Sequence, residues 1–246
     1  GEVLVFLDAD VSVTAAWAAR LPAALERLRA RPLTITGSLC TVPARSSWIE
    51  RHWFAPRLPR ATHVGTGHML VMRRDFTELG GFDETLATGE DYEICARARG
   101  RGGEVVVDPE LVAVHRGFPR TLRSFIAREA WHGAGDATSL GAVLHSRVAL
   151  LTLVWLALHA LVVGAAVLSR PGAALLGSAG ILGICLASSA AKYGVRSPAR
   201  TLATTALFYF YFGGRALAWT GRGRSRGRAA ERRRGAARAV ATGKPA

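Results

Sequence analysis

Hydrophobic and polar residues follow two different patterns along the chain. Up to about residue 145, apolar residues alternate with charged ones as in a globular domain, whereas residues 148–219 form long apolar runs with few charges. The opening run, residues 1–7, is continuous and rich in Val, Leu and Phe, which is typical of a strand buried on both faces. Shorter apolar stretches that predict further strands lie at residues 33–36, 68–72, 104–107 and 111–114.

One helix is predicted between the first two strands. Thr14 can cap it, Pro22 lies in its first turns, and its apolar positions recur every three or four residues: Trp17, Leu21, Leu25 and Leu28. Strand, helix and strand together make a β-α-β unit, so we expect an α/β domain with a largely parallel sheet. A second helix is predicted from Glu90 to Arg99, where Gly100 can end it.

The long apolar runs predict helices that cross a membrane. Residues 148–168 and 172–191 are each about as long as the twenty residues needed to cross ~30 Å of hydrocarbon. A buried helical hairpin in a soluble protein is the alternative. A third run, residues 202–219, is interrupted by Gly213, Gly214 and Arg215. We expect two crossings, with this third helix lying in, or re-entering from, the cytoplasmic face.

Basic residues indicate which ends of these helices face the cytoplasm. Lys192, Arg196 and Arg200 follow the second run, and much of the net charge of +14 lies in residues 221–246. We expect this tail to be disordered and cytoplasmic. Because aromatic residues are not interleaved with its arginines, anionic lipids are favoured over nucleic acid as its partner. Three domains follow: residues 1–146, 147–220 and 221–246.

The cysteines also fit a cytoplasmic location of the first domain. Cys40, Cys95 and Cys185 are far apart and show neither a disulfide framework nor the spacing of a zinc site. A reducing, cytoplasmic setting is therefore expected for the first domain, at the inner face of a cell membrane that the chain crosses more than once.

Two carboxylates end the opening strand. Asp8 and Asp10 are one residue apart at the carboxyl end of the strand, where open α/β sheets place their ligands. Together they can hold a divalent cation that keeps open positions for the phosphates of a substrate. An acidic turn without a ligand is the alternative.

Three more segments are candidates for chemistry. The glycines of Gly65-Thr66-Gly67 permit close approach of the backbone to a ligand. Glu90 and Asp91 lie in a first helical turn, where the macrodipole favours ionised carboxylates, so either can serve as a base or simply cap the helix. His115, at the end of a strand, is either structural or a ligand.

In this order and spacing, the motifs resemble those of family-2 glycosyltransferases of the GT-A fold, over residues 1 to about 135. The resemblance rests on Asp8-Ala9-Asp10, the segment 65–74, the turn 80–84, Gly89-Glu90-Asp91 and Val114-His115. It implies a partial GT-A (Rossmann-like) mixed sheet, followed by the transmembrane segment. It also implies a nucleotide-diphospho-sugar donor and a lipid-linked or membrane-proximal acceptor.

The resemblance assigns roles to these residues. Mg²⁺ or Mn²⁺ would bridge the donor diphosphate to Asp8 and Asp10, with His115 reaching the metal in some members. Asp91 would be the base that deprotonates the acceptor hydroxyl for inverting transfer, with Glu90 as its neighbour. Residues 65–67 would contact the donor or acceptor.

Two departures from the family pattern qualify the resemblance. The family's nucleotide-binding strand and helix precede the strand at which this sequence begins, so we expect these residues alone to lack most of the base pocket and to be inactive. An interfacial amphipathic helix is predicted near residues 118–133, and it carries Arg128 and Trp131 as donor or acceptor contacts. The glutamine of the processive members' signature is absent here, which argues against polymer synthesis.

Two other functions remain open on the sequence alone. A haloacid-dehalogenase-type phosphatase also begins with an apolar strand and two aspartates, but Ser12 stands where that family has Thr or Val, and no lysine precedes Lys192. A degenerate, non-catalytic transferase domain that acts as a membrane-bound partner is the second alternative.

Overall fold

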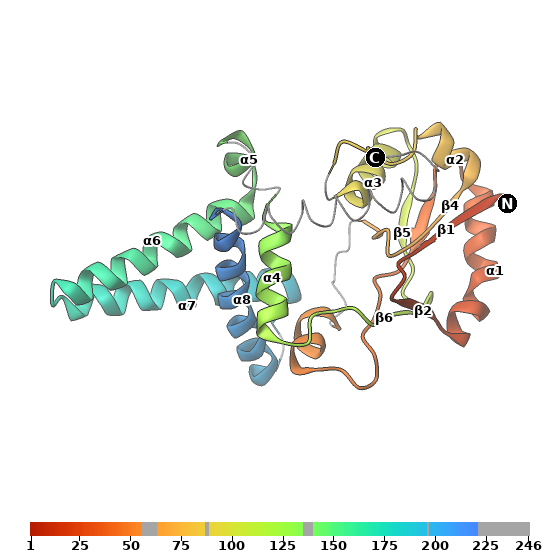
Figure 1. The fold of residues 1–246 in the computed structure, drawn as a ribbon. Coiled ribbons are helices and arrows are strands. Elements are labelled where there is room, and N and C mark those ends of the chain that lie inside the picture. Colours follow the sequence, from red (N-terminus) through yellow and green to blue (C-terminus); the bar gives the residue numbers. More distant parts are fainter. Residues whose placement is uncertain (56–62, 87–88, 135–139, 196, 221–246) are drawn as a thin grey trace, which may run out of the picture. The chain divides into compact units, whose positions relative to one another are not determined.

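The computed structural model describes residues 1–55, 63–86, 89–134, 140–195 and 197–220. It divides into two compact units, Gly1–Phe118 and Pro119–Ala246 (Figure 1). The predicted basic tail, residues 221–246, lies outside the described residues.

The first unit is built on two small sheets. The larger sheet has the strand order β1-β4-β3-β5, with β1 (Val3–Leu7), β4 (His68–Met72), β3 (Ile35–Gly37) and β5 (Val105–Val107). The smaller sheet pairs β2 (Val11–Val13) with β6 (Ala113–His115) in antiparallel fashion. The strands at residues 33–36, 104–107 and 111–114 are thus confirmed to within two residues.

The sheet is mixed, which confirms the mixed sheet that the resemblance implied, whereas the largely parallel sheet expected from the β-α-β unit is wrong. The strand β4 lies between β1 and β3 and runs antiparallel to both, whereas only β3 and β5 are parallel. The first two strands of the predicted β-α-β unit are therefore not neighbours. Pairing between segments that are distant in sequence decides this strand order, and the local pattern of apolar residues does not predict it.

Strand β1 is not buried on both faces, contrary to the expectation from its composition. It lies at an edge of the sheet, where Val5 and Leu7 are each 43% exposed. Its other residues do pack inward: Leu4 and Phe6 lie against the core cluster that Met69 and Val71 help to form.

Helices cover both faces of the larger sheet. Helix α1 (Ala15–Ala30) is capped by Thr14, whose hydroxyl accepts a hydrogen bond from the Trp17 N–H, and it packs on Leu70 and Met72. Helices α2 (Arg73–Glu78) and α3 (Glu90–Gly100) flank the other core cluster, to which α3 contributes Ile94, Cys95 and Ala98. A short π-helix, η1 (Glu50–Phe54), follows β3. The expected α/β class is confirmed.

The described part of the second unit is helical. It contains α4 (Leu122–His132), α5 (Leu140–His145), α6 (Arg147–Val167), α7 (Pro171–Tyr193) and α8 (Pro198–Ala218). Helices α6 and α7 lie side by side and are antiparallel (Figure 1). Val162 and Leu158 of α6 approach α7 at Gly177 and Gly180, where a β-carbon would come within 2.7 Å and 3.1 Å of these side chains.

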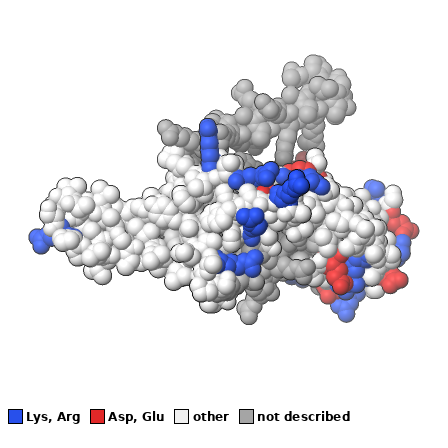
Figure 2. Space-filling model, turned by 90° about the horizontal axis from the view of Figure 1, so that it is seen from below, with Lys and Arg blue, Asp and Glu red and all other residues white. Residues whose placement is uncertain are grey.

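Two of these helices, α6 and α7, are long and apolar enough to cross a membrane. They match the expected runs at residues 148–168 and 172–191. Figure 2 shows the visible face of these two helices with almost no charged side chains. Among the described helices, α8 is not one of those that are long and apolar enough to cross a membrane, and the role expected for residues 202–219 stays a prediction.

Candidate active site

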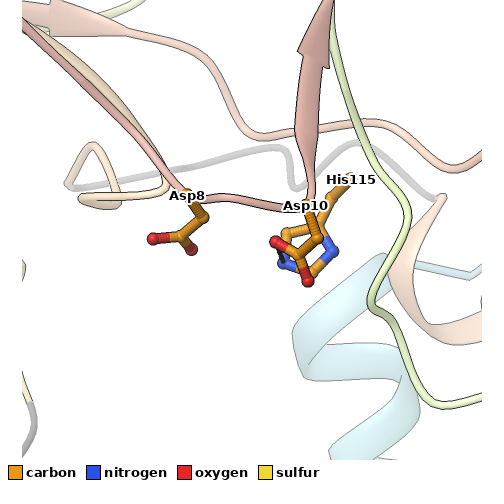
Figure 3. A group of neighbouring side chains, drawn as sticks. All are labelled: Asp8, Asp10 and His115. Atoms are coloured by element: carbon orange, nitrogen blue, oxygen red, sulfur yellow. Dashed lines mark ion pairs between the residues drawn. The ribbon is translucent and has the colours of Figure 1, made fainter. Parts of the chain in front are cut away.

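The two sheets bring Asp8, Asp10 and His115 together. Asp8 follows β1, Asp10 precedes β2, and the pairing of Val11 with His115 places the end of β6 beside the acids. One ligand atom from each of the three residues lies within 4.8 Å of the others. Figure 3 shows both carboxylates and the imidazole gathered at this turn. Such a group can hold a metal ion.

The backbone around the acids leaves room for their carboxylates. A β-carbon added at Gly67 would lie 2.9 Å from Asp8 Oδ2, and one added at Gly117 would lie 1.8 Å from Asp10 Oδ2. Any side chain at these two positions would therefore push a carboxylate away. Two carboxylates held in this way suit a hard divalent cation such as Mg²⁺ or Mn²⁺.

His115 is positioned by its surroundings. Its ring stacks on Phe118 at a centroid distance of 4.1 Å, and Phe118 stacks in turn on Phe54. The Gly117 N–H donates to Nδ1 at 3.0 Å, so a neutral ring carries its proton on Nε2, 3.5 Å from Asp10 Oδ1. In this tautomer His115 orients Asp10, and a metal would bind at Nε2 only in the other tautomer, with the proton on Nδ1.

A tight turn links the acid pair to the predicted base. In the turn Gly65–His68, the His68 N–H donates to the Gly65 carbonyl at 3.0 Å. At one end of the turn Gly67 lies against Asp8, and at the other a β-carbon added at Gly65 would lie 3.5 Å from Asp91 Oδ2. The Cα atoms of these two glycines are at most about 7 Å apart. The structure therefore brings Asp8 and Asp91 to one turn.

The first turn of α3 presents Glu90 and Asp91 differently. The Thr66 hydroxyl donates to Glu90 Oε1 at 3.2 Å, which ties this carboxylate to the turn. Asp91 Oδ1 accepts from the N–H of Tyr92 at 2.7 Å, while Oδ2 lies on the side of Gly65. Gly89 enters the helix with φ of 88°, a left-handed conformation that favours glycine.

His68 supports the site, although the sequence pattern does not single it out. It follows Gly67 directly and is 1% exposed. The Trp17 indole N–H donates to Nε2 at 2.7 Å, while the Ser38 N–H donates to Nδ1 at 3.1 Å and Ser38 Oγ lies 2.8 Å from the same nitrogen. Burial lowers the pKa of His68 to about 4, so the ring is neutral and anchors the turn.

Cys40 is a second residue that sequence reasoning missed. Burial raises the pKa of its thiol to about 11, and the negative charges of Asp8 and Asp10 add to the effect. The thiol therefore lies in the field of the acid pair and stays protonated at neutral pH. The spacing of the cysteines along the sequence does not reveal that the Cys40 thiol lies in the electrostatic field of Asp8 and Asp10.

Arg128 and Trp131 lie on α4, in the second unit. Helix α4 begins after Thr121, which forms a capping box with Ser124, so the helix expected near residues 118–133 is confirmed. The Arg128 guanidinium donates to Glu129 Oε1 at 3.0 Å. A contact of either residue with donor or acceptor remains a prediction.

Comparison with known families matches the model of glycosyl transferase family group 2 to residues 38–219. The chain belongs to this family. The match includes Gly65, Asp91 and His115, whereas Asp8 and Asp10 lie before it. Membership in a glycosyltransferase family contradicts the haloacid-dehalogenase alternative.

Relatives of this glycosyltransferase-family chain include pre-mycofactocin glycosyltransferases of Mycobacterium tuberculosis, from strains CDC 1551 / Oshkosh and ATCC 25618 / H37Rv. Each is 33% identical over 85 residues, which cover 34% of this chain and 18% of the relative. The match thus spans less than a fifth of these relatives. A solved structure, GalNAc-T7 with UDP, GalNAc and Mn²⁺, aligns at 19% identity over 55% of this chain and 34% of its own. The TM-score of this alignment is 0.36.

Proposed function

We propose that the chain forms the metal-binding and acceptor-activating part of an inverting glycosyltransferase. The observation that carries this proposal is the Gly65–His68 turn, which joins the cluster of Asp8, Asp10 and His115 to Asp91 in a chain of this family. The donor is a nucleotide-diphospho-sugar, and the acceptor presents a hydroxyl group.

The acid pair would hold Mg²⁺ or Mn²⁺. Asp8 and Asp10 supply the carboxylate ligands, and His115 orients Asp10 or joins as a ligand once Nε2 is free. The ion, when bound, neutralises charge that develops on the departing nucleoside diphosphate. Gly67 and Gly117 serve this function by leaving the two carboxylates undisturbed.

Asp91 is the base in this proposal. Its Oδ2 lies at the Gly65 end of the turn whose other end, Gly67, lies against Asp8. A carboxylate there can take the proton from the acceptor hydroxyl as that oxygen attacks from the face opposite the leaving group. Glu90, tied to Thr66, fixes the turn relative to α3.

The acceptor is lipid-linked or close to a membrane. The support is the pair of helices α6 and α7, which are long and apolar enough to cross a bilayer. The first unit then works at the cytoplasmic face of the inner membrane, where nucleotide sugars are made. The basic residues 221–246, outside the described residues, would bind anionic lipids on the same side.

Replacement of Asp91 by Asn in the complete protein tests this function. We expect transfer to fall by roughly 10²- to 10⁴-fold, the usual contribution of a general base, while binding of Mn²⁺ and of the donor persists. Glu26→Gln, which removes an exposed carboxylate of α1 in the same unit, is the matched control and keeps full activity.

The assay follows a radiolabelled sugar from nucleotide donor to membrane lipid extract. Undiminished transfer by Asp91→Asn would assign the base elsewhere. Equal loss of donor binding and transfer would make Asp91 a binding residue. A complete protein that binds donor and Mn²⁺ but transfers no sugar would favour the degenerate, non-catalytic alternative.

A further inference from the structure

An exposed aromatic side chain lies next to the proposed base. Tyr92 follows Asp91 in the first turn of α3, and its backbone N–H donates to Asp91 Oδ1 at 2.7 Å. Tyr92 is 58% exposed, more than any other large apolar or aromatic residue in the described part of the first unit. Packing of the core therefore does not account for an aromatic ring at this position.

The Tyr92 ring has an open face. The ring of His63 meets it at an interplanar angle of 72°, with the ring centres 5.8 Å apart. In such an edge-to-face pair one ring presents only its edge to the other, so His63 covers at most one face of Tyr92. Within the residues that the structure describes, the phenol oxygen of Tyr92 makes no hydrogen bond. The other face of the ring is therefore available to a ligand.

One short segment of chain touches both this ring and the base. His63 packs against Tyr92, and two residues later a β-carbon added at Gly65 would lie 3.5 Å from Asp91 Oδ2. Two residues of chain span at most about 7 Å. The ring and the carboxylate therefore lie along the same short segment, and a single sugar residue is large enough to contact both.

A sugar ring suits both groups. One face of a pyranose consists mainly of C–H groups, whose slight positive charge complements the negative face of an aromatic ring. Its hydroxyl groups point outward from the rim, where a carboxylate can accept a proton from one of them. A lipid chain fits less well, because burying it takes an apolar groove and not a single ring beside a carboxylate.

We propose that Tyr92 is a stacking surface for the acceptor, and that the acceptor is a glycolipid whose reacting hydroxyl belongs to a sugar ring. This inference rests on the proposed glycosyl transfer, because it takes Asp91 as the group that meets the acceptor hydroxyl. It adds the chemical class of the acceptor and a residue that binds it. Tyr92 acts on acceptor binding and takes no part in proton transfer.

The test uses the complete protein in detergent and four variants. Tyr92→Ala and Tyr92→Leu remove the aromatic ring, and the leucine variant keeps a large apolar side chain. Tyr92→Phe keeps the ring and removes only the phenol oxygen. Arg99→Ala is the matched control, because it removes a large exposed side chain two turns further along α3. Since both positions are exposed, we expect all four variants to have the thermal midpoint of the wild type.

The acceptor is supplied as the glycolipid fraction of a membrane extract, with sugar-free phospholipids as a separate probe and a saturating radiolabelled nucleotide sugar as donor. We expect transfer to the glycolipid fraction only. Loss of the ring should raise the apparent KM for the glycolipids roughly 3- to 10-fold and leave kcat nearly unchanged, because stacking holds the substrate and the transition state equally. Tyr92→Phe and Arg99→Ala should keep the wild-type values.

Each contrary result has a distinct meaning. An unchanged acceptor KM in Tyr92→Ala, together with loss of transfer in Asp91→Asn, would overturn this inference and leave the proposed function standing. Equal rises in acceptor KM for Tyr92→Phe and Tyr92→Ala would overturn stacking, because the phenol oxygen would then hold the acceptor. Transfer to the phospholipids alone would overturn the sugar acceptor. A complete wild-type protein that transfers no sugar would overturn both proposals.

Discussion

Gly117→Ala is expected to weaken metal binding without unfolding the protein. The added β-carbon would lie 1.8 Å from Asp10 Oδ2, a separation that real atoms do not tolerate below about 3 Å. The carboxylate must therefore retreat by more than about 1 Å. Since metal–oxygen distances in a working site vary by only about 0.2 Å, such a retreat takes Asp10 out of the coordination sphere.

The backbone should tolerate the same substitution. Gly117 is exposed and does not have a positive φ, and the group it meets is the movable end of a side chain. Alanine also lowers the entropy of the unfolded chain, worth about 0.4–1 kcal/mol. We therefore expect a free energy of unfolding within about 1 kcal/mol of the wild type.

Titration with Mn²⁺, followed by the electron paramagnetic resonance signal of the free ion, measures the affinity. Loss of a ligand or its support typically weakens metal binding by about 10- to 100-fold, and we expect that loss for Gly117→Ala. Gly100→Ala is the matched control, because its β-carbon would meet nothing within 4 Å. Wild-type Mn²⁺ affinity in Gly117→Ala would refute the assignment of Asp10 as a ligand.

Two further substitutions test the packing of the two units. Gly214→Ala should lower the thermal midpoint in detergent by the equivalent of about 1–3 kcal/mol, because its β-carbon would lie 2.9 Å from the Ile126 carbonyl. Gly213→Ala is the control and should leave the midpoint unchanged, because its β-carbon would have its nearest neighbour at 3.9 Å. Equal thermal midpoints for the two variants would contradict the close contact between α4 and α8. Burial lowers the pKa of His68 from 6.5 to about 4 in the folded protein, so as the pH falls the imidazole of the unfolded chain takes up its proton before that of the folded protein does. The stability that is present above pH 6.5 should therefore be lost as the pH falls toward 4, by up to about 3 kcal/mol. His68→Phe should flatten this dependence in denaturation measured from pH 7 to 4, and an unchanged slope would exclude His68 as its source.

The local sequence pattern was sufficient to predict most helices and strands and part of the candidate active site. The apolar run that ends in Asp8 and Asp10, the Gly65–Gly67 segment and the acids that open α3 were all recognisable, because each depends on a few consecutive residues. The limits of α6 and α7 were likewise close to the expected ones, since hydrophobic length decides them.

The sequence could not show which side chains meet across the fold. His68 looked like the first residue of an apolar strand, and only its hydrogen bonds to Trp17 and Ser38 make it a neutral anchor of the turn. Glu129 lies within the helix predicted near residues 118–133, and nothing in the local sequence shows that its side chain is buried. It is buried because α8 presents a glycine at the point of contact.

The sequence by itself determined the class of this protein: an α/β domain with paired acids at a strand end, followed by helices of membrane-crossing length. Those features follow from periodicity and from runs of similar residues, which are local. The tertiary structure decided the mixed strand order, the exposed edge of β1, the union of Asp8 with Asp91 at one turn and the burial of Glu129. Each of these requires contact between segments far apart in the chain, and such contacts are selected by the packing of the whole fold.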